Sequence, residues 1–377
     1  MSPWPKYSRE EITAVSEVLR SGKVNYLFGE NGKFFEQEFA SFVGTRYALA
    51  LANGTLALDI ALRAIGISLN DEVIVTPRSY IASVSCVSLL GAKPVFADVD
   101  YNSQNITAQN IEKLITKRTK AIICVHLGGM PCEMDPIIRL AKRYNLFVIE
   151  DCAQAHGAMY KGKSVGSIGH VSTWSFCNDK IMTLGGEGGM ITTNSKRIDS
   201  FARAFNNHGK NFKKLSPQLK SKIPKFKYIH DDIGTNYRMT EMQASIGRIQ
   251  LKKLQKWSQA RAKNANEIYK AIEHLPIARI PIIEDHLKHA FYKCYVMIDK
   301  KYLQVGWSRD KIIYEINARG VSCFSGSCPE IYLEKSFKKS YKISLKNAKA
   351  LGRDSLMLTV HPTLTNKEIA KIKTAVK

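Results

Sequence analysis

The feature of this sequence that most restricts its fold is an alternation of short apolar runs with amphipathic stretches from residue 47 onward. The runs show little polar alternation, which is typical of strands buried on both faces of a sheet. Because helical patterns separate them, we expect a mainly parallel, seven-stranded sheet with right-handed crossovers. The seven runs are YALAL (47–51), EVIVT (72–76), KPVFAD (93–98), KAIICVHL (120–127), LFVIED (146–151), VSTWSF (171–176) and GMITT (189–193).

The chain has 377 residues, a length that favours two domains. A long helix is expected from about Thr240, and the pattern changes after it. FYKCYVMI (291–298) reads as a strand, and SRDKIIYEINARG (308–320) reads as a helix. We therefore expect a large α/β domain with an N-terminal helix over 1–255 and a smaller α+β domain over 256–377.

The composition describes an ordinary globular protein with a large positive charge. It has 56 Lys and Arg against 33 Asp and Glu, a formal net charge of +23. A lysine-rich solvated surface explains this first, an anionic small-molecule substrate second, and nucleic acid a distant third. None of the eight cysteines forms C-x-x-C, which argues against a zinc site or a disulfide framework. The chain shows no membrane-length apolar run and no secretion signal, so we expect a cytoplasmic protein.

The first polar signal at the end of a predicted strand is Asn53-Gly54-Thr55. In open α/β sheets, ligands bind beyond the carboxyl ends of the strands. Free amides at the start of the following helix, together with the Thr55 hydroxyl, would form a phosphate cradle, and Gly54 would let the anion approach the backbone. Taken alone, this stretch could equally be a plain helix N-cap.

The second signal is Asp151, which ends a very apolar strand. An unpaired carboxylate there is costly, so we expect a cationic partner. The alternatives are a helix N-cap or an ion pair with a surface lysine. A metal site on Asp151 and His156 lacks further ligands, and we expect no metal. Cys152 with His156 could suggest a thiol nucleophile, but no third group to orient the pair is visible.

The third signal is SFCNDKIMTLGGEGG (175–189), in which Ser175 ends a strand and Lys180 follows in a glycine-rich loop. A lysine that forms a Schiff base must be partly desolvated and close to a planar cofactor. GGEGG does not lie between a strand and a helix, so it is no dinucleotide fingerprint, and no G-K-[ST] follows for a Walker loop. An incidental surface lysine in a glycine-rich turn is the plain alternative.

The three signals together describe one cofactor. It has a phosphate, a ring nitrogen that needs an anionic partner and an aldehyde that needs an amine, and pyridoxal 5'-phosphate has all three.

The order of these segments resembles the aspartate-aminotransferase-like (fold type I) pyridoxal-phosphate enzymes. More closely, it resembles the sugar-nucleotide aminotransferases of the DegT/StrS family. The resemblance extends over nearly the whole chain. It rests on NGTLALDIALRAIGI, DEVIVTPRSYIAS, GAKPVFADVD, VIEDCAQAHGA, SFCNDKIMTLGGEGG, NNHGK and GTNYRMTEMQASIGRIQLKKL, in that order.

The resemblance implies a role for each residue around the cofactor ring. Lys180 would hold the cofactor as a Schiff base and then act as general base and acid. Asp151 would keep the ring nitrogen protonated, and Gln154 would lie near the ring hydroxyl. Tyr80 falls where the family places an aromatic ring stacked on the cofactor.

The resemblance also implies the phosphate ligands and a dimer. Gly54, Thr55 and Ser175 would hold the phosphate, and Asn236 would reach in from the neighbouring subunit of a homodimer with a shared active site. The basic stretch over 208–230, including His208 and Lys210, would contact the nucleotide diphosphate.

The expected reaction is transfer of the amino group of L-glutamate to a nucleotide-linked keto-sugar, at C-4 of a 4-keto-6-deoxyhexose, for O-antigen, capsule or glycan synthesis. Relatives that remove a sugar hydroxyl carry histidine at the position of Lys180, so the lysine favours transamination. Cys328 stands where some relatives have histidine, which leaves sugar recognition open. The alternatives are a pyridoxal-phosphate dehydratase or lyase on the same scaffold, and a basic nucleic-acid-binding regulatory protein.

Overall fold

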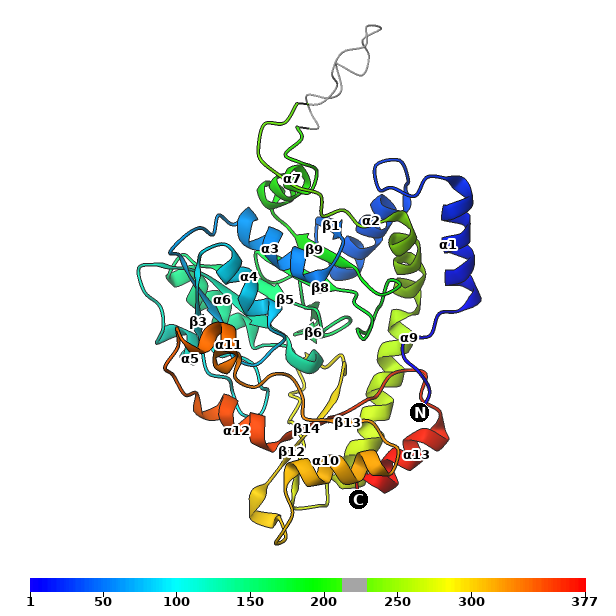
Figure 1. Ribbon diagram of the computed structural model, residues 1–377, viewed down its shortest axis with the longest axis vertical. Helices are drawn as coiled ribbons and strands as arrows, with labels where there is room; N and C mark the ends of the chain where they lie inside the picture. Colours follow the sequence, from blue (N-terminus) through cyan, green and yellow to red (C-terminus); the bar gives the residue numbers. More distant parts are fainter. Residues whose placement is uncertain (212–228) are drawn as a thin grey trace, which may run out of the picture.

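The computed structural model describes residues 1–211 and 229–377 (Figure 1). A seven-stranded sheet forms its centre, and every strand falls on one of the apolar runs, so this prediction is confirmed. The strands are β1 (Tyr47–Leu51), β2 (Glu72–Val75), β3 (Lys93–Phe96), β4 (Thr119–Val125), β5 (Phe147–Asp151), β8 (Val171–Ser175) and β9 (Gly189–Thr193).

The sheet is mainly parallel, as predicted. Its strand order is β1-β9-β8-β5-β4-β2-β3, and β9 alone runs opposite to the other six. The register pairs Gly189 at the start of β9 with both Leu51 and Ser175. The carboxyl ends of β1 and β8 therefore lie on either side of one glycine. This places two of the predicted polar signals at the same edge of the sheet.

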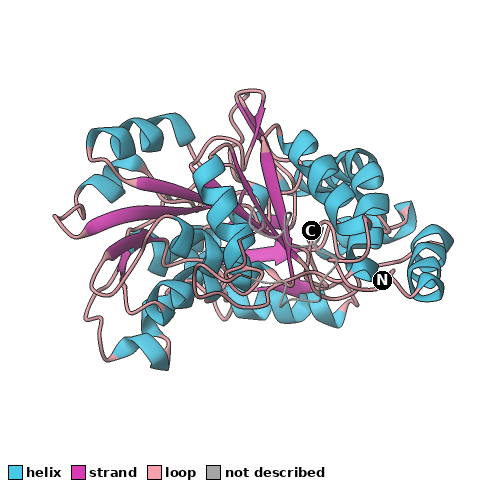
Figure 2. Ribbon diagram, turned by 90° about the horizontal axis from the view of Figure 1, so that it is seen from above, coloured by secondary structure: helices cyan, strands magenta, loops and turns pink. Residues whose placement is uncertain are grey.

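Helices cover both faces of the sheet (Figure 2). Neighbouring side chains on one strand enter different cores: Val73 and Val75 pack in one cluster, and Ile74 packs in another. This arrangement explains the continuous apolar runs, because both faces of the strands are buried. The helices of this region are α2 (Asn31–Val43), α3 (Gly54–Ala64), α4 (Ala82–Leu89), α5 (Ala108–Glu112), α6 (Met134–Arg143) and α7 (Lys196–Phe205).

Two further helices border this region, α1 (Arg9–Ser21) and the long α9 (Glu241–Ile272). Thr240 caps α9, which begins where the sequence predicts it. The helix runs continuously across residues 255 and 256 and extends from the sheet region into the C-terminal part of the chain (Figure 1). The expected domain boundary thus falls inside a helix, and the division into two domains stays a prediction.

The C-terminal part has a small antiparallel sheet with strand order β10-β12-β14-β13. Its strands are β10 (Ala278–Arg279), β12 (Cys294–Ile298), β13 (Cys323–Phe324) and β14 (Ser355–Leu358), and its helices are α10 (Arg309–Ala318), α11 (Lys335–Lys338), α12 (Lys346–Asp354) and α13 (Asn366–Ala375). A third sheet joins this part to the first, because β11 (Leu287–Lys288) pairs with β6 (Met159–Tyr160), which pairs with β7 (Lys163–Ser164). Short 3-10 turns occur at Leu127–Gly129, Lys300–Tyr302 and Ile331–Leu333.

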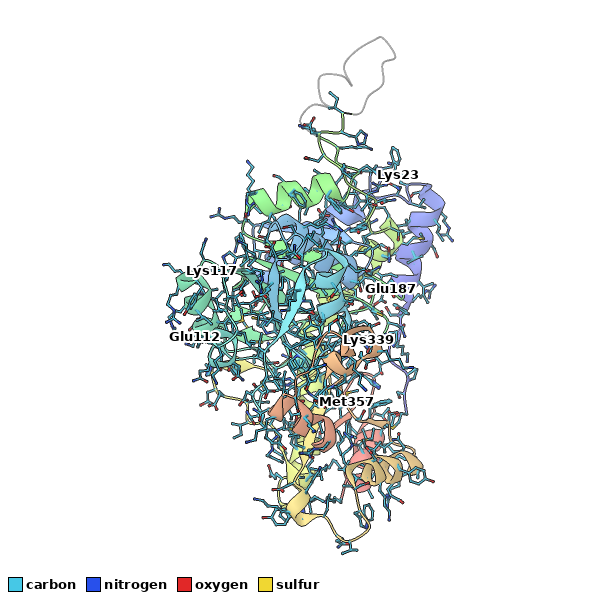
Figure 3. All side chains as sticks on the ribbon, turned by 60° about the vertical axis from the view of Figure 1, so that its left-hand side comes forward. Lys23, Glu112, Lys117, Glu187, Lys339 and Met357 are labelled. Carbon is cyan, nitrogen blue, oxygen red and sulfur yellow. The ribbon has the colours of Figure 1, made fainter. Side chains whose placement is uncertain are left out.

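Basic side chains are spread over the surface of the described residues. Lys23, Lys117 and Lys339 are exposed and lie on separate parts of the molecule (Figure 3). Most of the densest basic stretch, residues 212–228, lies outside the described residues, so its expected contact with a nucleotide stays a prediction. Within the described ranges, no helix combines the length and the apolar character needed to cross a membrane.

Candidate active site

Gly54 and Ser175 are in direct contact at the carboxyl edge of the sheet. A Cβ atom built on Gly54 would lie 2.6 Å from the Ser175 Cβ and 3.1 Å from its Oγ. Only a glycine therefore lets the start of α3 approach the end of β8. The Asn53 side chain caps α3 by accepting a hydrogen bond from the Leu56 amide at 3.0 Å.

The start of α3 offers an anion-binding surface. The first amides of a helix have no partner within the helix, so the Gly54 and Thr55 amides point outward from its N-terminus. The Thr55 side chain is exposed, and Ser175 is half-buried beside it in the sheet. Two amides, two hydroxyl groups and the positive end of the helix dipole are the groups that bind a phosphate. The residues present thus fit the phosphate of the expected cofactor.

Asp151 is buried at the end of β5, next to β8 in the sheet. Its Oδ2 accepts a hydrogen bond from the Ser83 hydroxyl at 2.8 Å, and its Oδ1 accepts one from the Ala153 amide at 3.1 Å. Burial raises the pKa of the Asp151 carboxyl, and these hydrogen bonds and the charge of Lys180 oppose the rise. Within residues 1–211 and 229–377, Asp151 forms no ion pair. A buried carboxylate in this state fits the protonated ring nitrogen of the expected cofactor.

Lys180 lies in the loop between β8 and β9, and its side chain is 14% exposed. Its Nζ is 3.6 Å from the Asp179 Oδ1 and 5.0 Å from the centre of the Tyr292 ring. The Tyr292 hydroxyl donates a hydrogen bond to the other oxygen of Asp179. The Trp4 indole nitrogen donates to the Lys180 carbonyl at 2.8 Å. The lysine is thus partly desolvated and held on both its side chain and its backbone.

The glycine-rich stretch after Lys180 brings separate loops together. Gly185 and Gly186 have φ angles of 80° and 119°, in the region that favours glycine. Gly189 lies so close to the Asn53 carbonyl that a Cβ would overlap it. Gly189 thus packs against the start of α3, whereas a Cβ on Gly185 would lie 3.2 Å from Ile246 of α9 and one on Gly186 would enter open space.

Gln154 and Tyr80 lie near the same edge. Gln154 is buried, and its Oε1 accepts a hydrogen bond from the Gly128 amide at 2.7 Å. Tyr80 precedes α4, three residues before Ser83, and its ring is 68% exposed. The Tyr80 carbonyl accepts a hydrogen bond from the amide of Ser83, whose hydroxyl in turn donates to Asp151, and an exposed aromatic side chain at this position fits a planar group stacked upon it.

The remaining predicted residues lie on a neighbouring loop. The backbones of Asn236 and Asn207 form an isolated β-bridge. The carbonyl of the next residue, Tyr237, accepts a hydrogen bond from the Ala52 amide at 2.8 Å. This segment therefore borders the end of β1 in the same chain, and the contribution of Asn236 to a partner subunit stays a prediction. His208 is exposed, and the backbones of Lys210 and His230 form an isolated antiparallel β-bridge.

His126, Glu150 and Cys152 form a buried group that could hold a metal by composition. Their geometry favours a hydrogen-bond network instead. His126 Nε2 lies 3.1 Å from a Glu150 oxygen, while the amides of Gly166 and Ile168 both donate to the same carboxylate at 2.9 Å. The carboxylate is thus used to hold the loop after β7 against the sheet.

The surroundings of Cys152 argue against a role as a thiol nucleophile, as the sequence analysis expects. Burial raises the pKa of the Cys152 thiol well above its usual value. His156 packs between Trp174 and Phe176, each ring centre 5.3 Å from its own, and burial lowers the pKa of His156 to about 3. With a pKa this low, His156 is neutral at pH 7 and cannot supply the imidazolium that a reactive Cys152 thiolate would need.

Four residues that the sequence analysis did not single out contact the site. Three of them reach Asp151 or Lys180 from distant parts of the chain and carry no local motif, namely Ser83, Tyr292 and Trp4, and the fourth is Asp179. The position of Asp179 next to Lys180 was the one signal that could have found it.

Comparison with known proteins supports the resemblance. The model of the DegT/DnrJ/EryC1/StrS aminotransferase family matches residues 5–377. GDP-perosamine synthase of Caulobacter vibrioides is 37% identical over 342 residues, 90% of this chain and 87% of that protein. dTDP-3-amino-3,6-dideoxy-alpha-D-galactopyranose transaminase of Aneurinibacillus thermoaerophilus is 34% identical over 371 residues, 98% and 95% of the two chains. The crystal structure of an aminotransferase from Psychrobacter cryohalolentis superposes with a TM-score of 0.96 at 50% identity and covers 100% and 97% of the two chains.

Proposed function

Because the chain belongs to the DegT/DnrJ/EryC1/StrS aminotransferase family, we propose that it transfers the amino group of L-glutamate to C-4 of a nucleotide-linked 4-keto-6-deoxyhexose. The family and the named relatives make it a nucleotide-sugar aminotransferase, and the family implies pyridoxal 5'-phosphate as cofactor. The donor, the position on the sugar and the product are the proposal. The observation that supports amino transfer is the buried carboxylate of Asp151, which has no ion pair among the described residues and lies in the field of Lys180. The donor and the C-4 position rest on the resemblance to the family.

The cofactor supplies an aldehyde that takes up the amino group and a ring that accepts electrons. Lys180 would hold the cofactor, and its Nζ would take the proton from the α-carbon of the donor and return one to the sugar carbon. Asp151 would balance the positive charge on the ring nitrogen. The amides of Gly54 and Thr55 and the Ser175 hydroxyl would bind the phosphate.

Further parts of the proposal concern the assembly and the substrate. We place the enzyme in the cytoplasm as a homodimer, with Asn236 of each subunit contributing to the site of the other. His208, Lys210 and the basic residues after them would bind the nucleotide diphosphate. The aminated sugar would enter O-antigen, capsule or glycan synthesis.

A substrate panel tests the proposal. The purified enzyme, supplied with pyridoxal 5'-phosphate and L-glutamate, is incubated with GDP-, dTDP- and UDP-linked 4-keto-6-deoxyhexoses and with their 3-keto isomers. The product is identified by mass spectrometry and NMR. We expect a 4-amino sugar and a stoichiometric amount of 2-oxoglutarate.

Two results would refute parts of the proposal. Amination of the 3-keto isomers alone would show that C-4 is wrong while leaving the aminotransferase activity intact. A deoxygenated sugar that contains no nitrogen would instead support the dehydratase alternative.

A further inference from the structure

Positive charges gather around the Tyr292 ring beside Lys180. The Nζ of Lys293 lies 4.8 Å from the centre of that ring, and the Nζ of Lys180 lies 5.0 Å from it. Tyr292 itself is buried, and its hydroxyl is occupied by Asp179. Two amino groups from separate segments, residues 180 and 293, therefore flank one aromatic ring at the candidate active site.

The acids of this region do not balance its bases. Asp179 pairs with Lys180 and accepts from Tyr292, while Lys293 forms no ion pair in the part of the chain that the structure describes. Arg261, from α9, is buried and also lacks an acidic partner there. An uncompensated cluster of cations favours an anionic ligand.

Electrostatic coupling indicates that these groups share one environment. Burial lowers the pKa of Lys293, and the charges of Arg261 and Lys180 lower it further, against the opposing effect of Asp179. Burial together with Arg261 and Lys293 lowers the pKa of His361 to about 4, so this imidazole is neutral at pH 7. Lys293 is thus the half-buried cation next to Lys180 that can meet a ligand, whereas the guanidinium of Arg261 is enclosed.

We propose that Lys293 binds the α-carboxylate of the amino donor, an inference that rests on the proposed function. In that reaction Lys180 would hold the cofactor, and the amino group of the donor would have to bind where the Lys180 amine lies. The α-carbon of the donor carries both the amino group and the α-carboxylate, so the carboxylate must also lie close to the position of the Lys180 Nζ. Lys293, which shares the Tyr292 ring with Lys180, would offer a charge-assisted hydrogen bond to this carboxylate, and Arg261 would add a favourable field.

The test measures recognition of the donor in the enzyme with its cofactor bound. Lys293→Met removes the charge and keeps the length of the side chain, Lys293→Arg keeps a charge, and Lys288→Met is the matched control because Lys288 is exposed on β11. The first readout is the dependence of the half-reaction on L-glutamate concentration. The second is the dissociation constant of α-methyl-L-glutamate, which has no α-hydrogen to lose, measured by calorimetry. Cofactor absorbance and thermal unfolding show whether each variant is folded and loaded.

For Lys293→Met we expect the half-saturating glutamate concentration and the α-methyl-L-glutamate dissociation constant to rise about 10- to 100-fold. Lys293→Arg should recover part of this loss, and Lys288→Met should match the wild type. Wild-type values for a folded Lys293→Met variant would overturn the inference, and so would a loss confined to the nucleotide-sugar half-reaction, which would assign Lys293 to the diphosphate. A wild-type enzyme that reacts with no amino acid would instead refute the proposed function.

Discussion

Replacing Asp151 by asparagine should stabilise the cofactor-free protein and weaken cofactor binding. The carboxylate accepts hydrogen bonds from Ser83 at 2.8 Å and from the Ala153 amide at 3.1 Å. The Ser83 hydroxyl also lies 3.0 Å from the Ser79 hydroxyl, so it can donate to Ser79 and accept from an asparagine amide. The substitution therefore keeps both hydrogen bonds and removes a buried charge that has no cationic partner among the described residues.

The magnitude follows from the cost of burying a polar group without compensation. That cost is about 1–3 kcal/mol, and more for a charge. We expect the free energy of unfolding of the cofactor-free variant to exceed that of the wild type by about 1–3 kcal/mol at neutral pH. With the cofactor, the variant loses a hydrogen bond between charged groups, and its dissociation constant for pyridoxal 5'-phosphate should rise about 10- to 100-fold.

The stability difference should depend on pH. The pKa of Asp151 in the folded protein is raised above its unfolded value of 3.8 by burial. The contribution of Asp151 to the stability of the cofactor-free wild-type protein is therefore fully present below that value. It is lost as the pH rises through the folded pKa. The asparagine variant has no such loss, so its advantage should vanish in acid and reach its full size above the folded pKa.

Thermal unfolding of both cofactor-free proteins across this pH range measures the stability difference, and titration with pyridoxal 5'-phosphate measures the affinity. A variant that is less stable than the wild type at neutral pH would refute the claim that Asp151 lacks a cationic partner. An unchanged dissociation constant would refute its placement at the ring nitrogen.

Three further substitutions test the rest of the site. Lys180→Ala should leave the fold intact and abolish the absorbance band of the lysine-bound cofactor, and a retained band would mean that another lysine holds it. Gly54→Ala places a Cβ 2.6 Å from Ser175, which should cost about 1–3 kcal/mol of stability and weaken cofactor affinity at least about tenfold in a titration; unchanged affinity would argue against a phosphate site here. Trp4→Phe removes the donor to the Lys180 carbonyl and should lower the free energy of unfolding by about 1 kcal/mol in denaturant titrations; equal stability would show that this bond is not needed.

The sheet and the placement of the three polar signals at one edge could be predicted because each follows from a local pattern combined with one rule of topology. Apolar runs mark the strands, and the carboxyl ends of parallel strands meet at one edge. Gly54, Asp151 and Ser175 each stand at such an end, so their neighbourhood follows once the sheet is parallel. Lys180 belongs to the loop that leaves the same edge.

The residues that complete the site could not be predicted in this way. Ser83, Trp4 and Tyr292 reach it from segments about 70 to 180 residues away in the chain. Lys293 is one of 56 Lys and Arg in the sequence, and no neighbouring motif distinguishes it. The Ser83 contact depends on how α4 packs against the sheet, and the Tyr292 and Lys293 contacts depend on how the C-terminal part packs beside it. Local patterns determine neither.

The most direct test of the account follows the nitrogen atom itself. The enzyme is incubated with L-[¹⁵N]glutamate and the nucleotide-linked 4-keto-6-deoxyhexose that it accepts, and the sugar product is analysed by mass spectrometry, with Lys180→Ala as control. We predict one ¹⁵N atom in each product molecule for the wild type and no labelled sugar for the variant. An unlabelled product from the wild type, or labelled product from Lys180→Ala, would contradict the account.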